Sequence, residues 1–293
     1  MSLESHSLSL TPEEFHGEII VPDVFNAVIS AGNLALEVRE QGLRAQVKST
    51  KEDLVTQGDR YVSEALKKSL GVLFPGIAVL DEERTETHGI DLKAQGMVAI
   101  IDPIDGTSNY YSGYLEMDES KKNPYWGVSV GIMKNGELVA GVIFQPQLQK
   151  IYYAEKGKGA YMNGKRIHVS NIHSLAGAKL IYSSPYPKDK EAFFSSARVI
   201  ERIETETSMQ AETLGSQVIE AMQVAEGKKD AFLHLCTKPW DMAAAVVIAR
   251  EAGGRIMTAF GTEYPLFGPA ILISNSNLDV SPITSLVGEE LSF

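Results

Sequence analysis

Hydrophobic residues recur at helical spacing in two segments near the N-terminus. Between Pro22 and Gly42 they occupy every third or fourth position, namely Val24, Val28, Ala31, Ala35 and Val38. Proline suits the first turn of a helix and glycine its C-terminal cap, so this segment is predicted to form one amphipathic helix. A similar pattern follows Asp59 and stops before the Pro-Gly turn at 75–76, which predicts a second helix.

Short, continuous apolar runs come next along the chain. Residues 77–83 (IAVLDEE) and 96–102 (GMVAIID) each end in acidic residues, which is typical of buried strands whose C-terminal ends carry function. Between 125 and 170, apolar runs are separated by Asn-Gly pairs at 135–136 and 163–164, a preferred sequence for tight hairpin turns. This region is therefore predicted to form an antiparallel meander.

Strand and helix patterns alternate after about residue 175. The predicted order is a strand at 179–184, a helix near 189–202, a short strand, a helix at 215–227, a strand at 231–235, a helix at 240–254 and a further strand. This alternation favours a layered α/β half that follows an α+β half. We therefore expect a flexible tail over residues 1–17, an N-terminal α+β half over 18–175 and a C-terminal α/β half over 176–293.

The composition restricts the classes of partner. Among 293 residues, 27 basic and 38 acidic ones give a net charge of −11, which disfavours non-specific binding to nucleic acid or to an anionic membrane. The single cysteine, Cys236, excludes an internal disulfide, indicates a reducing compartment and is interpreted as a buried thiol of the core. The start of the chain lacks a secretory signal pattern, and no apolar run approaches the roughly 18 residues of a membrane helix. We expect a cytoplasmic protein with no nucleic-acid or membrane partner.

Residues 98–109 read VAIIDPIDGTSN, an apolar run that leads into two aspartates and a glycine. Pro103 disfavours the helical conformation at Asp102, so we expect a strand that ends in extended form at Asp102, with Asp102 and Asp105 at its tip. Hard cations such as Mg²⁺ prefer carboxylate oxygens, and this pair could hold one beside a phosphate. A turn that exposes two acidic residues at the surface is the alternative.

The residues that follow these aspartates favour an anion site. Gly106 permits a positive φ angle at the turn. Thr107 and Ser108 are common where helices start, and the backbone amides of such a start could face an anion. The segment therefore combines a candidate cation platform with a candidate phosphate site.

Two further acidic motifs complete the pattern. Glu82 and Glu83 end an apolar strand, and Asp241 follows Trp240 at the start of an apolar helix, where it is expected to be the N-cap. With D-P-I-D-G-T-S-N-Y at 102–110 and E-A-G-G at 251–254, these motifs resemble the signatures of the inositol monophosphatase superfamily of metal-dependent, lithium-sensitive phosphatases. The resemblance extends over roughly residues 20–278 and implies a layered α-β-α-β-α sugar-phosphatase fold.

The resemblance implies a set of residues for metal binding and catalysis. Two or three Mg²⁺ ions would be held by Glu82, Asp102, the carbonyl oxygen of Ile104, Asp105 and Asp241. Thr107, together with Glu82, would help to orient and deprotonate a water molecule activated by the metals, and Thr107 would act through Asp59. The backbone amides of Gly106 and Thr107 would receive the phosphate.

The resemblance also implies a substrate side formed by Asp105, Gly215 and Ser216. Members typically carry a glutamate seven residues before the aspartate of the W-D motif, and here that position is His234. His234 is either an ordinary strand residue or the contact to a different leaving group. The segment at 110–126 is either a mobile flap over the metals or solvated surface.

The function implied by the resemblance is hydrolysis of a small phosphorylated metabolite of the inositol monophosphate type by a Mg²⁺-dependent phosphomonoesterase. Within the same chemistry, a 3′(2′),5′-bisphosphate nucleotidase and a fructose-1,6-bisphosphatase are alternatives. A non-catalytic regulator that binds a phosphorylated metabolite is an alternative of another class. Members of the superfamily are commonly homodimers, so a homodimer is expected.

Overall fold

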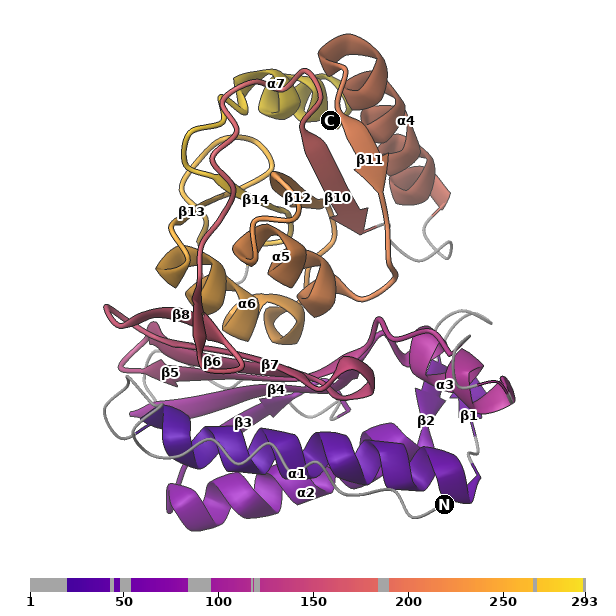
Figure 1. The fold of residues 1–293 in the computed structure, drawn as a ribbon, viewed down its shortest axis with the longest axis vertical. Helices are drawn as coiled ribbons and strands as arrows, with labels where there is room; N and C mark the ends of the chain where they lie inside the picture. Colours follow the sequence, from indigo (N-terminus) through magenta and orange to yellow (C-terminus); the bar gives the residue numbers. More distant parts are fainter. Residues whose placement is uncertain are drawn as a thin grey trace.

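Layers of helices alternate in space with the two larger β-sheets (Figure 1). The structure is a computed structural model that describes residues 20–42, 45–47, 54–83, 96–116, 118, 122–183, 190–265 and 268–291. The tail predicted over residues 1–17 lies outside these ranges. The predicted layer order α-β-α-β-α is confirmed.

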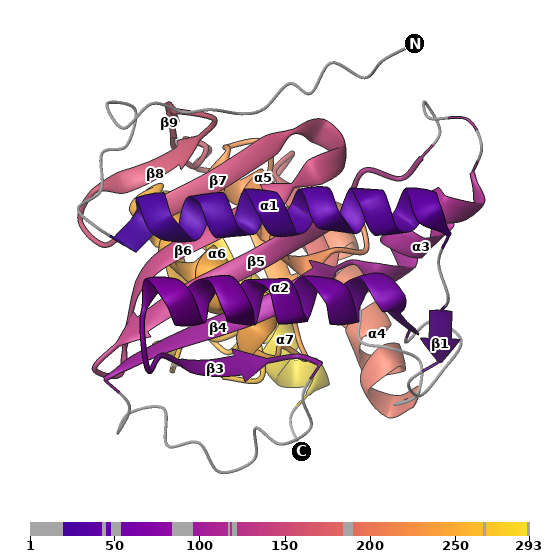
Figure 2. The ribbon, with the colours of Figure 1, turned by 90° about the horizontal axis from the view of Figure 1, so that it is seen from below.

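The first layer consists of the two helices predicted near the N-terminus. They are α1 (Ile20–Gln41) and α2 (Gln57–Leu73), and both lie across one face of the larger sheet (Figure 2). Between them in the sequence, β1 (Ala45–Val47) and β2 (Leu54–Thr56) form a short antiparallel pair. The apolar sides of α1 and α2 contact the sheet, which explains their amphipathic pattern.

The second layer is a seven-stranded sheet whose spatial order follows the sequence. Its strands are β3 (Ala78–Asp81), β4 (Met97–Asp105), β5 (Gly127–Lys134), β6 (Glu137–Gln145), β7 (Lys150–Glu155), β8 (Gly159–Met162) and β9 (Lys165–Ile167), with a 3₁₀ turn at Pro146–Leu148. Only β3 and β4 are parallel in this sheet, and the predicted antiparallel meander is confirmed. Both Asn-Gly pairs have positive φ angles, as tight hairpins require.

The remaining layers come from the C-terminal part of the chain. The second sheet has the order β11-β10-β12-β14-β13, with β10 (Lys179–Ser183), β11 (Gln210–Glu212), β12 (Ala231–His234), β13 (Gly254–Met257) and β14 (Ile271–Asn275). Helices α5 (Gln217–Ala225) and α6 (Pro239–Glu251) lie between the two sheets, and α4 (Lys190–Thr207) and α7 (Ser281–Glu290) cover the outer face (Figure 1). The sequence interpretation missed β14 and α7, although Pro282 marks the first turn of α7.

Helix α6 is apolar on all sides because it is packed between the two sheets. Every residue from Met242 to Ala249 is buried. Gly131 of β5 and Gly141 of β6 are direct cross-strand partners beneath this helix. A Cβ at Gly131 would lie 2.6 Å from the Cβ of Ala243, and one at Gly141 would lie 2.5 Å from the carbonyl oxygen of Ala244. These two glycines therefore allow the start of α6 to approach the larger sheet closely.

The structure corrects one expectation about a single residue. Cys236 is exposed, so its interpretation as a buried core thiol is wrong. It lies in the connection between β12 and α6, which runs along the surface rather than through the core. Among the helices of the described residues, none combines the length and the apolar character needed to cross a membrane.

Substitution of Gly131 by alanine should destabilise the protein. The new methyl group would overlap the backbone of α6, so the helix or the strand must move. Overpacking of this kind typically lowers the free energy of unfolding by ~1–3 kcal/mol. Thermal denaturation followed by circular dichroism measures the loss.

The matched control is Gly71→Ala in α2. Nothing lies within 4 Å of a Cβ at that position, and its φ angle is not positive. Alanine is the better helix former by up to ~1 kcal/mol, so this variant should be as stable as the wild type or slightly more so. Equal melting temperatures for Gly131→Ala and the wild type would show that α6 does not depend on the close contact.

Candidate active site

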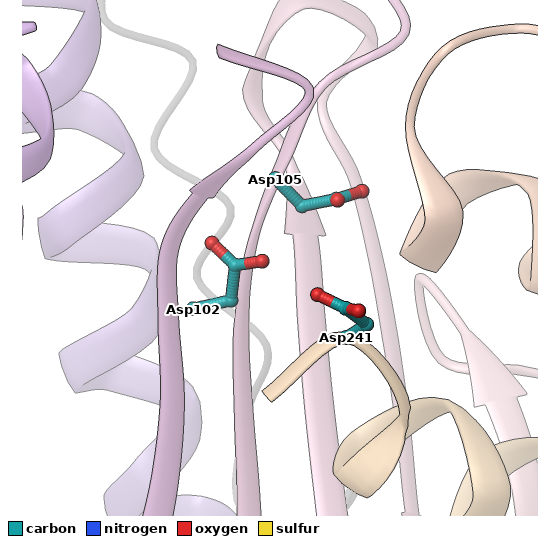
Figure 3. A group of neighbouring side chains, drawn as sticks. All are labelled: Asp102, Asp105 and Asp241. Atoms are coloured by element: carbon teal, nitrogen blue, oxygen red, sulfur yellow. The ribbon is translucent and has the colours of Figure 1, made fainter. Parts of the chain in front are cut away.

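Three buried carboxylates meet where β4 ends and α6 begins (Figure 3). Asp102, Asp105 and Asp241 each offer one carboxylate oxygen, and these atoms all lie within 4.8 Å of one another. The side chains of all three are at most 7% exposed. The alternative of a turn with two surface acids is therefore wrong for Asp102 and Asp105.

Asp102 and Asp105 reach the same side of the sheet although they are three residues apart. In a regular strand such residues face opposite sides, because side chains alternate. Asp102 pairs with Ser129 of β5, and Asp105 pairs with Gly127. Three residue steps along β4 therefore match two along β5, so β4 contains one extra residue. This β-bulge shifts the alternation and re-aims Asp105. Ile101 and Ile104 show the same shift, because both pack in the core against α1 and α2.

The prediction that the strand ends at Asp102 is wrong, because β4 continues to Asp105. Pro103 lies in the bulge, where a residue without an N–H group is tolerated because no ladder hydrogen bond is required of it. The carbonyl oxygen of Ile104 accepts a hydrogen bond from Oγ1 of Thr107 at 3.0 Å. The bulge therefore also brings this carbonyl beside Thr107.

Glu82 lies next to Asp102 because β3 and β4 run parallel and in register. Asp81 pairs with Ile101, so the following residues of the two strands are neighbours. The amide of Glu82 donates to the carbonyl of Ile101 at 3.4 Å. The side chain of Glu82, which is half-buried, shares a hydrogen bond with Asp102. Glu82 thus adds a fourth carboxyl group at the edge of the cluster.

Asp241 comes from α6, and its carboxylate points toward Asp102 and Asp105 (Figure 3). The prediction that it is the N-cap is wrong, because the helix starts two residues earlier, at Pro239. Proline is favoured at this first position, since its missing N–H group would have no acceptor there. Oδ2 of Asp241 instead accepts the amide of Lys238 at 2.6 Å, which fixes the carboxylate at the helix start.

Asp59 lies on the other side of β4, at the start of α2. Its Oδ2 accepts the amide of Thr56 at 2.7 Å in a capping box, and its Oδ1 accepts Oγ1 of Thr107 at 3.2 Å. Burial raises the pKa of Asp59 to about 7, and the negative charge of Glu83 adds to this while hydrogen bonds from Thr56 oppose it. The structure thus places Thr107 between the Ile104 carbonyl and a carboxyl group that titrates near neutral pH.

Gly106 has the positive φ angle, 81°, that the sequence predicts. It is the N-cap of α3 (Thr107–Leu115), so the amides of the first turn have no acceptor within the helix. A Cβ at Gly106 would lie 2.9 Å from the carbonyl oxygen of Tyr125. Both the conformation and the close contact therefore require glycine here. Of the 110–126 segment, residues 117 and 119–121 lie outside the described part of the chain.

Ser216 contacts the carboxylate cluster directly. Its hydroxyl donates to Oδ2 of Asp105, and the amide of Val218 donates to the same oxygen at 3.0 Å. Gly215 has a φ angle of 78°, and its amide donates to Oε1 of Glu220 at 2.9 Å. The start of α5 therefore holds Asp105 in place.

Glu220 and Asn109 organise this region and were missed in the sequence. Glu220 is fully buried and accepts hydrogen bonds from the hydroxyls of Ser183 and Thr213 and from the amides of Leu214 and Gly215. Nδ2 of Asn109 donates to the carbonyls of Tyr125 and Leu214 at 2.6 and 2.8 Å. A glutamate within the apolar segment QVIEAMQVA was the available signal for Glu220.

His234 is buried at the end of β12. Its ring is 6.4 Å from that of Phe232, which faces the core that contains α5 and α6. Nδ1 lies 3.0 Å from the carbonyl oxygen of Ser183. Burial lowers the pKa of His234 to about 4, against the opposing effect of backbone hydrogen bonds, so the ring is neutral at physiological pH. His234 therefore brings no positive charge to a phosphate.

Burial and mutual repulsion raise the pKa of all three aspartates in the cluster. The pKa of Asp105 rises to about 7 through burial, although hydrogen bonds from Ser216 and Val218 oppose the change. The pKa values of Asp102 and Asp241 lie well above their usual range, first because of burial and then because of neighbouring carboxylates. Within the described residues, no group donates to Oδ1 of Asp102. Mg²⁺ prefers oxygen ligands, and this cluster offers several carboxylate oxygens, one of which accepts no hydrogen bond from the described residues.

Comparison with known proteins identifies the family. Residues 18–288 match the inositol monophosphatase family. The chain belongs to this family. Its two signatures meet in space at the carboxylate cluster, since Asp102 and Asp105 come from one and Asp241 from the other.

Named relatives cover most of this member of the inositol monophosphatase family. The fructose-1,6-bisphosphatase/inositol-1-monophosphatase of Thermotoga maritima is 33% identical over 242 residues, which are 82% of this chain and 86% of that protein. Nus factor SuhB of Vibrio cholerae is 30% identical over 251 residues, 85% of this chain and 88% of that protein. The solved structure of extragenic suppressor protein suhB from Bartonella henselae has a TM-score of 0.78 at 26% identity and covers 92% of this chain and 98% of that chain.

Without metal, this family member should lose stability as the pH rises. The usual pKa of an aspartate is 3.8, whereas folded Asp59 and Asp105 hold their protons until about pH 7. Between these values the unfolded chain binds fewer protons than the folded one, so unfolding is increasingly favoured. The melting temperature of the metal-free protein should therefore fall by several degrees between about pH 5 and about pH 7.5.

Added Mg²⁺ should raise the melting temperature more at the higher pH, because a cation stabilises the ionised carboxylates. Asp105→Asn removes one of the two groups and should make the pH profile of the metal-free protein flatter. A metal-free wild type that becomes more stable between about pH 5 and about pH 7.5 would show that these carboxyl groups are not the dominant titrating groups.

Proposed function

We propose that this protein is a Mg²⁺-dependent phosphomonoesterase that hydrolyses a small phosphorylated metabolite of the inositol monophosphate type by direct attack of water. The observation that carries the proposal is the cluster of Asp102, Asp105 and Asp241 beside the Thr107–Asp59 pair. A candidate cation site, a candidate proton acceptor and a helix start lie together at one end of β4.

The residues that would hold two or three Mg²⁺ ions are all oxygen donors: Glu82, Asp102, the carbonyl of Ile104, Asp105 and Asp241. When bound, Mg²⁺ neutralises the carboxylates, polarises phosphate oxygens and lowers the pKa of coordinated water. Ser216 supports this arrangement. Its hydroxyl donates to Oδ2 of Asp105, so Oδ1 of the same carboxylate can face a cation.

Thr107, Asp59 and Glu82 would manage the proton of the attacking water. Thr107 shares its one hydroxyl proton between Asp59 and the Ile104 carbonyl, so its lone pairs can accept a proton from water. A carboxyl group with a pKa of about 7 is well matched to accept a proton near neutral pH. As the water oxygen bonds to phosphorus, the ester P–O bond breaks and a water proton passes through Thr107 to Asp59. The departing alkoxide takes a proton from solvent and leaves as an alcohol, and Asp59 returns its proton to solvent.

The start of α3 would bind the phosphate group. The amide of Gly106 lies at the N-cap of α3, and the amide of Thr107 belongs to the first residue of the helix. The partial positive charge of the helix dipole at this end favours an anion. Gly106 also lets this helix start pack closely against Tyr125 and Ser216, where a Cβ would not fit.

The substrate side would be formed by Asp105, Gly215, Ser216 and His234. The Thermotoga relative carries the name of a fructose-1,6-bisphosphatase and inositol-1-monophosphatase, so polyhydroxylated phosphate esters are the substrates expected first. A neutral His234 offers a hydrogen bond rather than a charge, which suits a hydroxyl group of the leaving alcohol. The 3′(2′),5′-bisphosphate nucleotidase activity remains the alternative within the same chemistry.

A non-catalytic regulator is the alternative of another class, and one relative does carry the name Nus factor. Binding a phosphorylated metabolite requires the cations and the helix start alone. The buried Asp59, held against Thr107, adds a proton acceptor that mere binding does not need. This favours turnover. A homodimer, a cytoplasmic location and a division into halves near residue 175 stay predictions.

Phosphate release from a substrate panel tests the proposed function. The panel contains inositol 1-phosphate, fructose 1,6-bisphosphate and 3′-phosphoadenosine 5′-phosphate, each with and without Mg²⁺. We expect one substrate to be hydrolysed well above the others and only with Mg²⁺. Asp105→Asn should lower kcat/KM by at least ~100-fold, because it removes a metal-facing carboxylate.

Variants of Thr107 separate catalysis from binding. Thr107→Val keeps the shape but removes the hydroxyl, so kcat should fall by roughly 100-fold or more while Mg²⁺ still binds. Thr107→Ser retains a hydroxyl and should recover most of the rate. No hydrolysis of any panel member by a wild-type protein that binds Mg²⁺ would favour the regulator.

A further inference from the structure

Ser129 is a buried polar group that the proposed function does not use. Its side chain is fully buried in β5, and its hydroxyl has no hydrogen-bond partner among the described residues. Leaving a buried hydroxyl unsatisfied typically costs ~1–3 kcal/mol, and few such groups persist in folded proteins. The position therefore calls for a partner.

The register of the sheet places Ser129 directly opposite Asp102. Opposed residues of an antiparallel pair project from the same face, with Cβ atoms about 4.5–5.5 Å apart. The face is that of α6, because the next residue on this side of β5 is Gly131, which meets Ala243. Ser129 thus lies between the larger sheet and the start of the helix that carries Asp241.

Asp102 has the complementary gap in its hydrogen bonding. Its Oδ1 is buried and accepts nothing from the described residues, whereas the hydroxyl of Ser129 is a donor without an acceptor. By contrast, Asp105 and Asp241 each receive hydrogen bonds, from Ser216 and from the Lys238 amide. Oδ1 of Asp102 therefore lacks such support among the described residues, although the side chain shares a hydrogen bond with Glu82.

We propose that Ser129 is a positioning residue of the metal centre: its hydroxyl donates to Oδ1 of Asp102 and keeps this carboxylate turned toward Asp105 and Asp241. Rotation of the side chains is sufficient, since the backbone already places the two residues opposite each other. A hydrogen bond of this kind fixes the orientation of a ligand and strengthens metal binding, typically by 10–100-fold. The inference rests on the proposed metal centre and adds a residue to it.

A second serine provides a matched control. Ser274 in β14 is also fully buried, and its hydroxyl also has no partner among the described residues. Its cross-strand neighbours are Ala231 and Arg255, so it opposes no carboxylate. Ser129→Ala and Ser274→Ala therefore make the same chemical change, once beside the cluster and once in the other sheet.

The test is Mg²⁺ binding to the metal-free full chain, measured by titration calorimetry with Mg²⁺ alone. For Ser129→Ala we expect the Kd for Mg²⁺ to rise by ~10-fold or more, and for Ser274→Ala we expect no change. The melting temperature of metal-free Ser129→Ala should not exceed that of the wild type, because the change removes the donor to Oδ1 of Asp102. The additional stabilisation by a fixed concentration of Mg²⁺ should be smaller than in the wild type.

Each other outcome overturns a defined claim. Equal Kd values for the wild type and Ser129→Ala would remove Ser129 from the metal centre and leave the proposed function intact. An equal loss of affinity in Ser274→Ala would show a general effect of buried serines and would overturn the inference as well. A wild type that binds no Mg²⁺ would overturn both the inference and the proposed function.

Discussion

The shift of side-chain alternation between Asp102 and Asp105 is the constraint on which the site depends. In a regular strand, Asp105 would face the apolar layer of α1 and α2, where a carboxylate has no partner and burial is costly. Ile104 would then face the polar side. One extra residue in β4 reverses both orientations. Asp102 and Asp105 therefore face α6, while Ile101 and Ile104 stay in the core. Function and packing therefore require the same bulge.

The cluster also depends on how closely α6 approaches the sheet. Gly131 and Gly141 give the helix room, and the small residues Ala243 and Ala244 fill the contact. This packing brings Asp241 to the aspartates of β4 and at the same time excludes water from them. The raised pKa values are the electrostatic consequence, and a bound cation offsets it. The same burial that disfavours the metal-free site thus makes it selective for a strongly charged ligand.

Much of the fold and the principal acidic residues could be predicted from the sequence, because periodicity, Asn-Gly turns and the order of the motifs are local signals. The bulge could not be, since alternation in β4 is broken by a pairing with β5 that the strand alone does not reveal. The start of α6 was misplaced for a related reason, as Pro239 and Asp241 both favour a helix start and only the structure shows which residue is the cap.

The residues that support the site were the hardest to predict. Asn109 binds the backbone of Leu214, and Glu220 binds the hydroxyl of Ser183, each of which lies far away in the sequence. Ser129 gains its interest only from its position opposite Asp102. Cys236 was taken for a core residue because free cysteines are usually buried, but here it lies in a surface connection. Long-range contacts decide each of these cases, and composition or spacing does not encode them.

The central claim is that the bulge places both aspartates of β4 on one cation together with Asp241. A crystal structure of the protein grown with Mn²⁺, analysed through the anomalous signal of the metal, tests this most directly. The account predicts an anomalous peak within coordination distance of carboxylate oxygens from Asp102, Asp105 and Asp241. A peak held by only one of the two β4 aspartates, or no peak at a saturating concentration of Mn²⁺, would contradict it.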